Sequence, residues 1–193
     1  MHSAFQYRNY LINRQIIALT GKLRLYSPDG RLVMYSQQKM FKLREDIRVY
    51  SDESRSEELL YIQARQIIDF SAAYDVHDSL SQEHIGTIRR RGLQSMARDE
   101  WIIMDANEQP VAVLIEDTLQ YALLRRLLLG TLLPQNYDIL IGDQRVADFK
   151  QRFNLLRYEL DLDFSLDSTN LLDRRLGVAA GVLLAIVEGK QSN

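Results

Sequence analysis

The chain of 193 residues contains no cysteine, which excludes disulfide bonds, thiolate nucleophiles and zinc sites with cysteine ligands. Proline occurs three times and glycine nine times, and no Pro-rich or Ser/Gly-rich linker divides the sequence. We therefore expect one domain over residues 1–193. The stretch Met1–Arg14 lacks the continuous apolar run of a secretory signal, so a cytoplasmic location is expected.

An excess of basic charge is also missing. The chain has 24 Lys and Arg against 26 Asp and Glu, which gives a formal net charge of −2. Proteins that bind nucleic acids usually carry a basic excess, because they displace counterions from phosphates. We therefore expect no nucleic-acid partner.

Most of the sequence consists of short alternating or β-branched runs separated by turn residues, a pattern that predicts roughly ten to twelve strands. Gly142-Asp143 joins two such runs and suits a type II′ turn, because only glycine takes the first position easily. So many strands with little helix between them indicate a sandwich or a barrel. The predicted strands are Leu23–Tyr26, Arg31–Tyr35, Ile47–Tyr50, Leu59–Arg65, Ile67–Ala73, Tyr74–Asp78, Ile85–Ile88, Trp101–Met104, Val111–Ile115, Tyr137–Ile141, Arg145–Phe149 and Leu155–Phe164.

Two segments predict helices instead. Asp117–Gly130 has matched start and stop signals and is expected to form a short surface helix. A second helix begins near Asp167, and its stretch Leu176–Val187 has no polar side chain. Such a helix is either buried in a core or spans a membrane. Its 12 residues reach about 18 Å, against about 30 Å of hydrocarbon, so the core is favoured.

Several stretches of the sequence resemble one known family in their order and spacing. Tyr10–Gln15 resembles the opening strand of the LURP-one-related family, and Tyr74–Asp78 with Ile85–Arg90 resembles its central hairpin. Trp101–Asp105 is similar to the next strand, and Asp173–Leu176 to the start of the terminal helix.

The LURP-one-related family is part of the tubby C-terminal-like superfamily, which also includes phospholipid scramblases. The resemblance implies a mainly β fold, a closed antiparallel barrel of about twelve strands threaded by the C-terminal helix. Tubby domains bind phosphoinositide headgroups through basic residues on the barrel, and scramblases are linked to lipid movement and calcium.

Known catalytic signatures are missing from the sequence. It has no Gly-x-Ser-x-Gly elbow, no phosphate-binding glycine-rich loop and no His-Glu-x-x-His motif, so we expect no enzymatic activity and no cofactor. His77 and His84 flank a polar loop with Asp75, Asp78 and Glu83. These side chains could ligate a divalent metal, but polar residues around a solvated turn are the simpler interpretation.

The scramblase comparison raises calcium at Asp161, Asp163 and Asp167. Phe164 and Leu166 interrupt this segment, and it lacks the glycine and glutamate of an EF-hand loop. Alternation along a strand accounts for the first two acids, which would face water. No metal site is therefore predicted, and these three residues are the candidates for calcium.

Basic residues supply the candidate anion site. Arg89 and Arg91, with Lys42 and Arg44 elsewhere, could hold a phosphate headgroup, because guanidinium groups bind phosphates bidentately. The alternative is a solvated strand end paired with acids such as Glu100. In a strand the intervening Arg90 would face the opposite way, so the triplet would not form one patch.

Three functions follow from these observations. The first is a non-enzymatic binding or scaffold module with an unknown ligand or protein partner. The second is a peripheral protein that binds anionic phospholipid or phosphoinositide headgroups. The third is a lipid-transfer protein whose terminal helix enters the bilayer, which the length of that helix disfavours.

Overall fold

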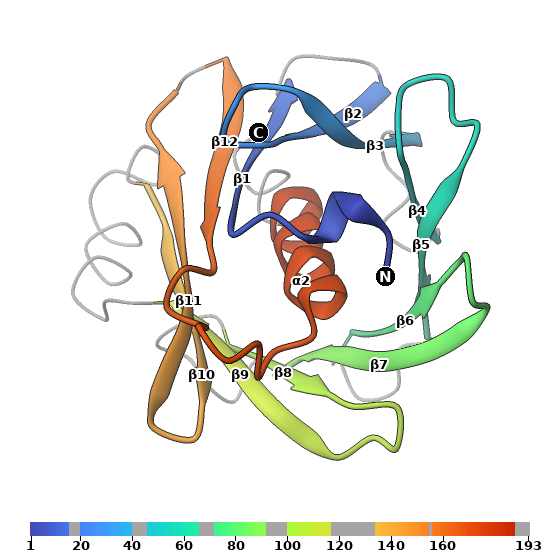
Figure 1. The fold of residues 1–193 in the computed structure, drawn as a ribbon. Coiled ribbons are helices and arrows are strands. Elements are labelled where there is room, and N and C mark those ends of the chain that lie inside the picture. Colours follow the sequence, from blue (N-terminus) through green and yellow to red (C-terminus); the bar gives the residue numbers. More distant parts are fainter. Residues whose placement is uncertain are drawn as a thin grey trace.

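The computed structural model describes residues 1–15, 20–39, 46–65, 72–91, 100–116, 134–154 and 156–187. Within these ranges the chain forms twelve strands, the short 3-10 helix η1 (Ser3–Phe5) and the helix α2 (Arg174–Val187) (Figure 1). The strands are β1 Asn9–Gln15, β2 Thr20–Tyr26, β3 Leu32–Lys39, β4 Ile47–Tyr50, β5 Glu58–Ala64, β6 Ala73–Asp78, β7 Glu83–Arg90, β8 Glu100–Met104, β9 Pro110–Glu116, β10 Asn136–Ile141, β11 Gln144–Arg152 and β12 Arg157–Asp163.

All twelve strands belong to one closed antiparallel barrel. Each strand pairs with the next along the chain, and β12 returns to pair with β1. The closing register runs from Asn9 opposite Asp163 to Gln15 opposite Arg157. Closure leaves no free sheet edge among the described strands. The barrel expected from the resemblance is confirmed, and the sandwich alternative is wrong.

Alternation along the strands separates the inside of the barrel from its outside. In β12, Tyr158, Leu160 and Leu162 are buried, whereas Glu159 and Asp161 lie on the outer face. This is the alternation predicted for this segment. β12 begins at Arg157, two residues later than the predicted strand, because the chain turns there from β11.

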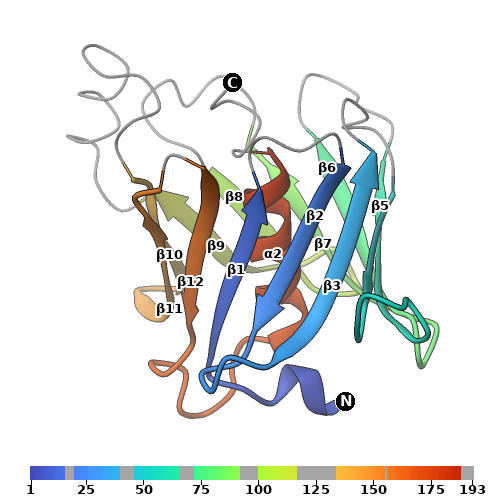
Figure 2. The ribbon, with the colours of Figure 1, turned by 90° about the horizontal axis from the view of Figure 1, so that it is seen from above.

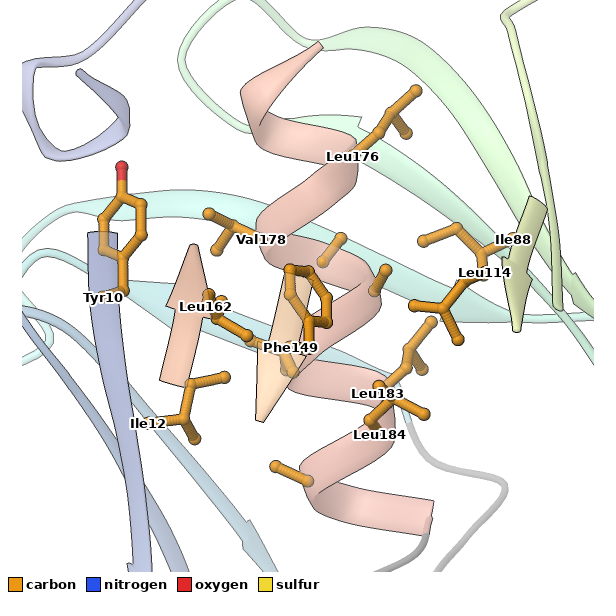
Figure 3. Close-up of a cluster of buried hydrophobic side chains, with 14 of the residues drawn as sticks. Tyr10, Ile12, Ile88, Leu114, Phe149, Leu162, Leu176, Val178, Leu183 and Leu184 are labelled. Atoms are coloured by element: carbon orange, nitrogen blue, oxygen red, sulfur yellow. The ribbon is translucent and has the colours of Figure 1, made fainter. Parts of the chain in front are cut away.

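Helix α2 lies inside the barrel, where strands surround it (Figures 1 and 2). Its side chains Val178, Leu183 and Leu184 are almost completely buried and lie among apolar side chains of the surrounding strands, including Ile12 and Leu162 (Figure 3). A helix that meets strands on all sides must be apolar on all sides.

The predicted core helix is confirmed over its apolar stretch, but its predicted start near Asp167 is wrong. The helix begins at Arg174, because the carboxylate of Asp167 accepts the backbone N–H groups of Leu171 and Leu172 in a loop ahead of it. Among the described residues, no helix is long and apolar enough to cross a membrane.

Glycines on α2 bring the helix close to the barrel wall. A Cβ atom on Gly177 would lie 2.5 Å from Cε1 of Phe164, and one on Gly181 would lie 2.8 Å from Cδ1 of Leu162. Both distances are shorter than a carbon–carbon contact. The small residues of this segment therefore allow the close approach of the strands that the sequence predicts.

The two ends of the barrel are distinguished by the elements that lie there (Figure 2). We call the end where β1 and α2 finish the upper end, and the end where α2 begins and η1 lies the lower end. A type II′ turn is predicted at Gly142-Asp143, which lies at the lower end. Such a turn requires a positive φ at its first central residue only, and here Gly142 has a φ of +58° whereas Asp143 has no positive φ. The predicted surface helix over Asp117–Gly130 and residues 67–71 of a predicted strand lie outside the described residues.

Candidate functional site

The predicted anion site begins with the arginines at the end of β7. Arg89 lies opposite Ile102 of β8, and by alternation it shares the outer face with Arg91 just beyond the strand. Arg90 instead lies opposite the buried Trp101, with its guanidinium carbon 5.6 Å from the centre of that ring. The arginine triplet is therefore split between two faces, as predicted.

The exposed Arg91 has a carboxylate partner. Its Nη1 donates a hydrogen bond to Oε1 of Glu100 at 2.6 Å, and 60% of the Arg91 side chain is exposed. An anion that binds Arg91 must therefore compete with this carboxylate. Lys42 and Arg44, the other two predicted residues, lie outside the described residues.

A network of charged side chains lies on the neighbouring outer face, over β6, β7 and the β8–β9 turn. Arg65 donates to Oδ2 of Asp75 at 2.7 Å and to Oε1 of Glu108 at 2.6 Å, and these bonds raise the pKa of Arg65. Burial alone would raise the pKa of Asp75, but the hydrogen bonds from Arg65 and Thr87 outweigh it and lower that pKa. The charges of this face therefore neutralise one another.

Two histidines lie side by side on this face. His77 and His84 are paired in register, with ring centres 5.2 Å apart, and Nε2 of His84 is 3.5 Å from Oδ1 of Asp75. Asp78 and Glu83 form hydrogen bonds with other residues instead. In the described part of the chain, no group of three or more His, Asp or Glu side chains is arranged to hold a metal ion.

The three calcium candidates each have their own partners. Asp161 forms a double hydrogen bond with Arg152, at 2.6 and 2.7 Å. Asp163 accepts from the backbone N–H of Ser165 at 2.8 Å. Asp167 is buried and accepts two backbone N–H groups in the loop ahead of α2, at 2.8 and 3.0 Å. These contacts stabilise local turns and strand pairs, and they leave the three acids in separate roles.

A partly buried ion pair attaches the start of α2 to the barrel wall. Nη1 of Arg175 donates to Oδ2 of Asp78 at 2.6 Å, and the same guanidinium binds Asp173 at 2.6 Å. Burial alone would raise the pKa of Asp78, but the bonds from Arg175 and from two backbone N–H groups lower it. Sequence analysis missed this pair, because 97 residues separate its members.

Two further arginines are buried at opposite ends of α2. Nη1 of Arg14 donates to the carbonyl oxygen of Ala185 at 2.7 Å, where a cation stabilises the negative end of the helix dipole. The guanidinium carbon of Arg174 lies 4.1 Å from the ring centre of Phe164 at the other end. Burial lowers the pKa of both arginines. Both therefore position the helix within the barrel.

Among the described residues, the tip of the β11–β12 hairpin at the upper end carries two strongly exposed apolar side chains. Phe153 and Leu156 are 63% and 65% exposed. Oδ1 of Asn154 accepts the backbone N–H groups of Leu156 and Arg157, at 3.0 and 3.1 Å, which fixes the turn. Sequence analysis missed this tip by extending the strand back to Leu155. The signal that was available is the asparagine, a residue typical of such turns.

Comparison with known proteins identifies the family of this chain. A family model described as LURP-one-related matches residues 32–185, which run from β3 into α2. No curated protein matches the chain at a significant level. The family match covers most of the chain and includes strands β3 to β12 and nearly all of α2, but not β1 and β2. The chain therefore belongs to the LURP-one-related family.

Proposed function

We propose that this protein is a non-enzymatic binding or scaffold module, formed by residues 1–193 as one domain in the cytoplasm. The observation that supports this proposal is that α2 fills the interior of the barrel. Barrels that carry or transform small molecules hold them in an interior cavity, whereas here α2 fills the interior with side chains such as Leu183 and Leu184. The outer surface and the two ends of the barrel are then the places where a partner can bind.

Affinity selection tests this proposal. The purified protein is incubated with a cell extract of metabolites, lipids and proteins, and the complex is isolated by gel filtration and identified by mass spectrometry. Heat-denatured protein is the control. We expect a component that co-elutes with the folded protein alone and that keeps its mass on prolonged incubation. A product that accumulates only in the presence of folded protein would contradict the non-enzymatic assignment.

A peripheral phospholipid- or phosphoinositide-binding protein, or a scramblase-like protein, is the second candidate. It is supported by the resemblance to the tubby C-terminal-like superfamily and by Arg89 and Arg91 on the outer face at the end of β7. Guanidinium groups bind phosphate bidentately. Glu100→Gln should strengthen binding to vesicles that contain a phosphoinositide, because it releases Arg91 from its ion pair.

Co-sedimentation with these vesicles distinguishes the two candidates. The double variant Arg89→Ala/Arg91→Ala should lose binding, and added salt should weaken binding of the wild type. Sedimentation that is independent of these arginines and of salt would remove the headgroup hypothesis and leave the binding module.

A further inference from the structure

Arg174, the first residue of α2, is a buried arginine at the lower end of the barrel. It is 7% exposed, and its Nη1 is buried and has no hydrogen-bond partner within the residues that the structure describes. The contact with the ring of Phe164 attracts the positive charge, but a ring face does not replace a hydrogen-bond acceptor. A buried charged donor without an acceptor costs free energy, so this nitrogen requires a functional explanation.

The charged groups around Arg174 leave room for an added anion. The carboxylate of Asp167 accepts two backbone N–H groups of the loop ahead of α2, and Asp173 binds Arg175 at 2.6 Å. Arg8, a second cation close to Arg174, is exposed. The positive end of the α2 dipole lies at the same place and also favours a negative charge. An oxyanion beside Arg174 would therefore supply the acceptor that the nearby acids do not.

The N-terminal segment covers this place. The ring of Tyr10 packs edge-on against Phe164, with ring centres 6.2 Å apart, and its hydroxyl donates to the carbonyl oxygen of Ala4 in η1 at 2.9 Å. η1 lies beside the first turn of α2 at the opening of the barrel (Figures 1 and 2). A ligand can therefore reach Nη1 of Arg174 when η1 moves aside.

η1 is attached to the barrel mainly through Phe5. Residues 1–8 precede the first strand, and Phe5 is the large apolar side chain that this segment buries, at 2% exposed. His2 lies 3.5 Å from Glu57, but both side chains are partly exposed, so this pair contributes little. Displacing η1 therefore costs mainly the burial of one phenylalanine. An apolar ligand that takes the same place restores that burial.

We propose that the lower end binds a small carboxylic acid with an apolar body, which takes the place of Phe5 while its carboxylate binds Arg174. The inference rests on the binding-module function and supplies the class of its ligand. A carboxylate fits this place better than a phosphate, because its two oxygens need fewer donors beside the rings of Phe164 and Tyr10.

Calorimetry with 3-phenylpropionate tests the site, because this acid combines the ring of phenylalanine with one carboxylate. The full-length variant Phe5→Ala vacates the place of the ring, so it should bind the acid roughly tenfold or more tightly than the wild type does. The amide of the same acid should not bind, because it offers Arg174 no negative charge. The double variant Phe5→Ala/Arg174→Met should not bind the acid.

Thermal melts without ligand distinguish a binding role of Arg174 from a structural one. Arg174→Met should keep or raise the melting temperature, because it replaces an unsatisfied buried charge with an apolar side chain. Arg14 is the matched control at the other end of α2, since it is 5% exposed but donates to the carbonyl oxygen of Ala185. Arg14→Met should lower the melting temperature by about 2–4 °C. This comparison does not depend on whether Phe5→Ala folds.

Three results would overturn the proposal. The first is a folded Phe5→Ala that does not bind the acid, or that binds the acid and its amide equally. The second is tighter binding of inorganic phosphate than of the acid, which would assign another class of ligand. The third is a loss of melting temperature for Arg174→Met as large as that for Arg14→Met. A partner that Arg174→Met retains in the affinity selection would leave the binding-module function intact while this site fails.

Discussion

Gly177 on α2 offers a substitution for which packing should reverse the usual effect on stability. In a solvated helix, Gly→Ala stabilises by about 1 kcal/mol. Here the new Cβ atom would lie 2.5 Å from Cε1 and 3.0 Å from Cζ of Phe164. That ring is held between Phe149, with ring centres 5.5 Å apart, and Arg174. Overpacking costs about 1–3 kcal/mol, so we expect Gly177→Ala to lower the unfolding free energy by about 1 kcal/mol.

Denaturant unfolding with an unchanged slope measures this loss. A double-mutant cycle with Phe164→Leu identifies its cause, because the smaller side chain removes the ring atoms and should turn the effect of Gly177→Ala toward stabilisation. Gly181→Ala is the comparison, since its nearest neighbours are the methyl ends of Leu162 at 2.8 and 2.9 Å, which can rotate. If Gly177→Ala stabilises the wild type by about 1 kcal/mol, α2 does not lie against Phe164 as described.

Three further predictions concern the core, the ion pair between Asp78 and Arg175, and the surface. Leu184→Asp should prevent folding, because it buries a carboxylate without a partner, and a soluble variant with a native melting curve would show that α2 is not the core. Asp78→Asn should lower the unfolding free energy by about 2 kcal/mol at neutral pH. This is less than the loss of a whole buried ion pair, because Arg175 keeps its bond to the carboxylate of Asp173. Since the pKa of Asp78 is lowered in the folded protein, its contribution is complete above the unfolded pKa of about 4 and is lost as the pH falls through the folded pKa. The difference between wild type and Asp78→Asn in acid titrations of unfolding should therefore shrink in that range, and a constant difference would contradict the ion pair. Arg91→Ala should change the unfolding free energy by less than about 1 kcal/mol, because its pair with Glu100 is exposed, and a larger loss in thermal melts would assign Arg91 a structural role.

Local patterns were sufficient to locate most of the barrel strands. Alternation and turn residues depend on neighbours in the sequence, which is why the hairpins around Gly142 and the core helix could be predicted. The closure of the barrel could not be derived in this way, because Asn9 and Asp163 pair across nearly the whole chain. The family resemblance supplied it.

The candidate sites were less predictable for the same reason. Arg89 and Arg90 point to opposite faces of the sheet because side chains alternate along a strand, and this was predicted from the sequence. The pair of Asp78 and Arg175 depends on where α2 enters the barrel, which no local pattern reports. Exposure of Phe153 depends on the position at which the β11–β12 hairpin turns, and a one-residue difference there decides whether an apolar side chain points into the core.

The pairing of β1 with β12 has a consequence for the order of events during synthesis. A growing chain appears from its N-terminal end, so β1 is made early, whereas β12 and α2 are the last described elements to emerge. Until then the nascent sheet has two open edges and an inner face without its helix. We expect such a chain to bind chaperones that recognise apolar strands, and to reach its compact form only after the ribosome has delivered α2.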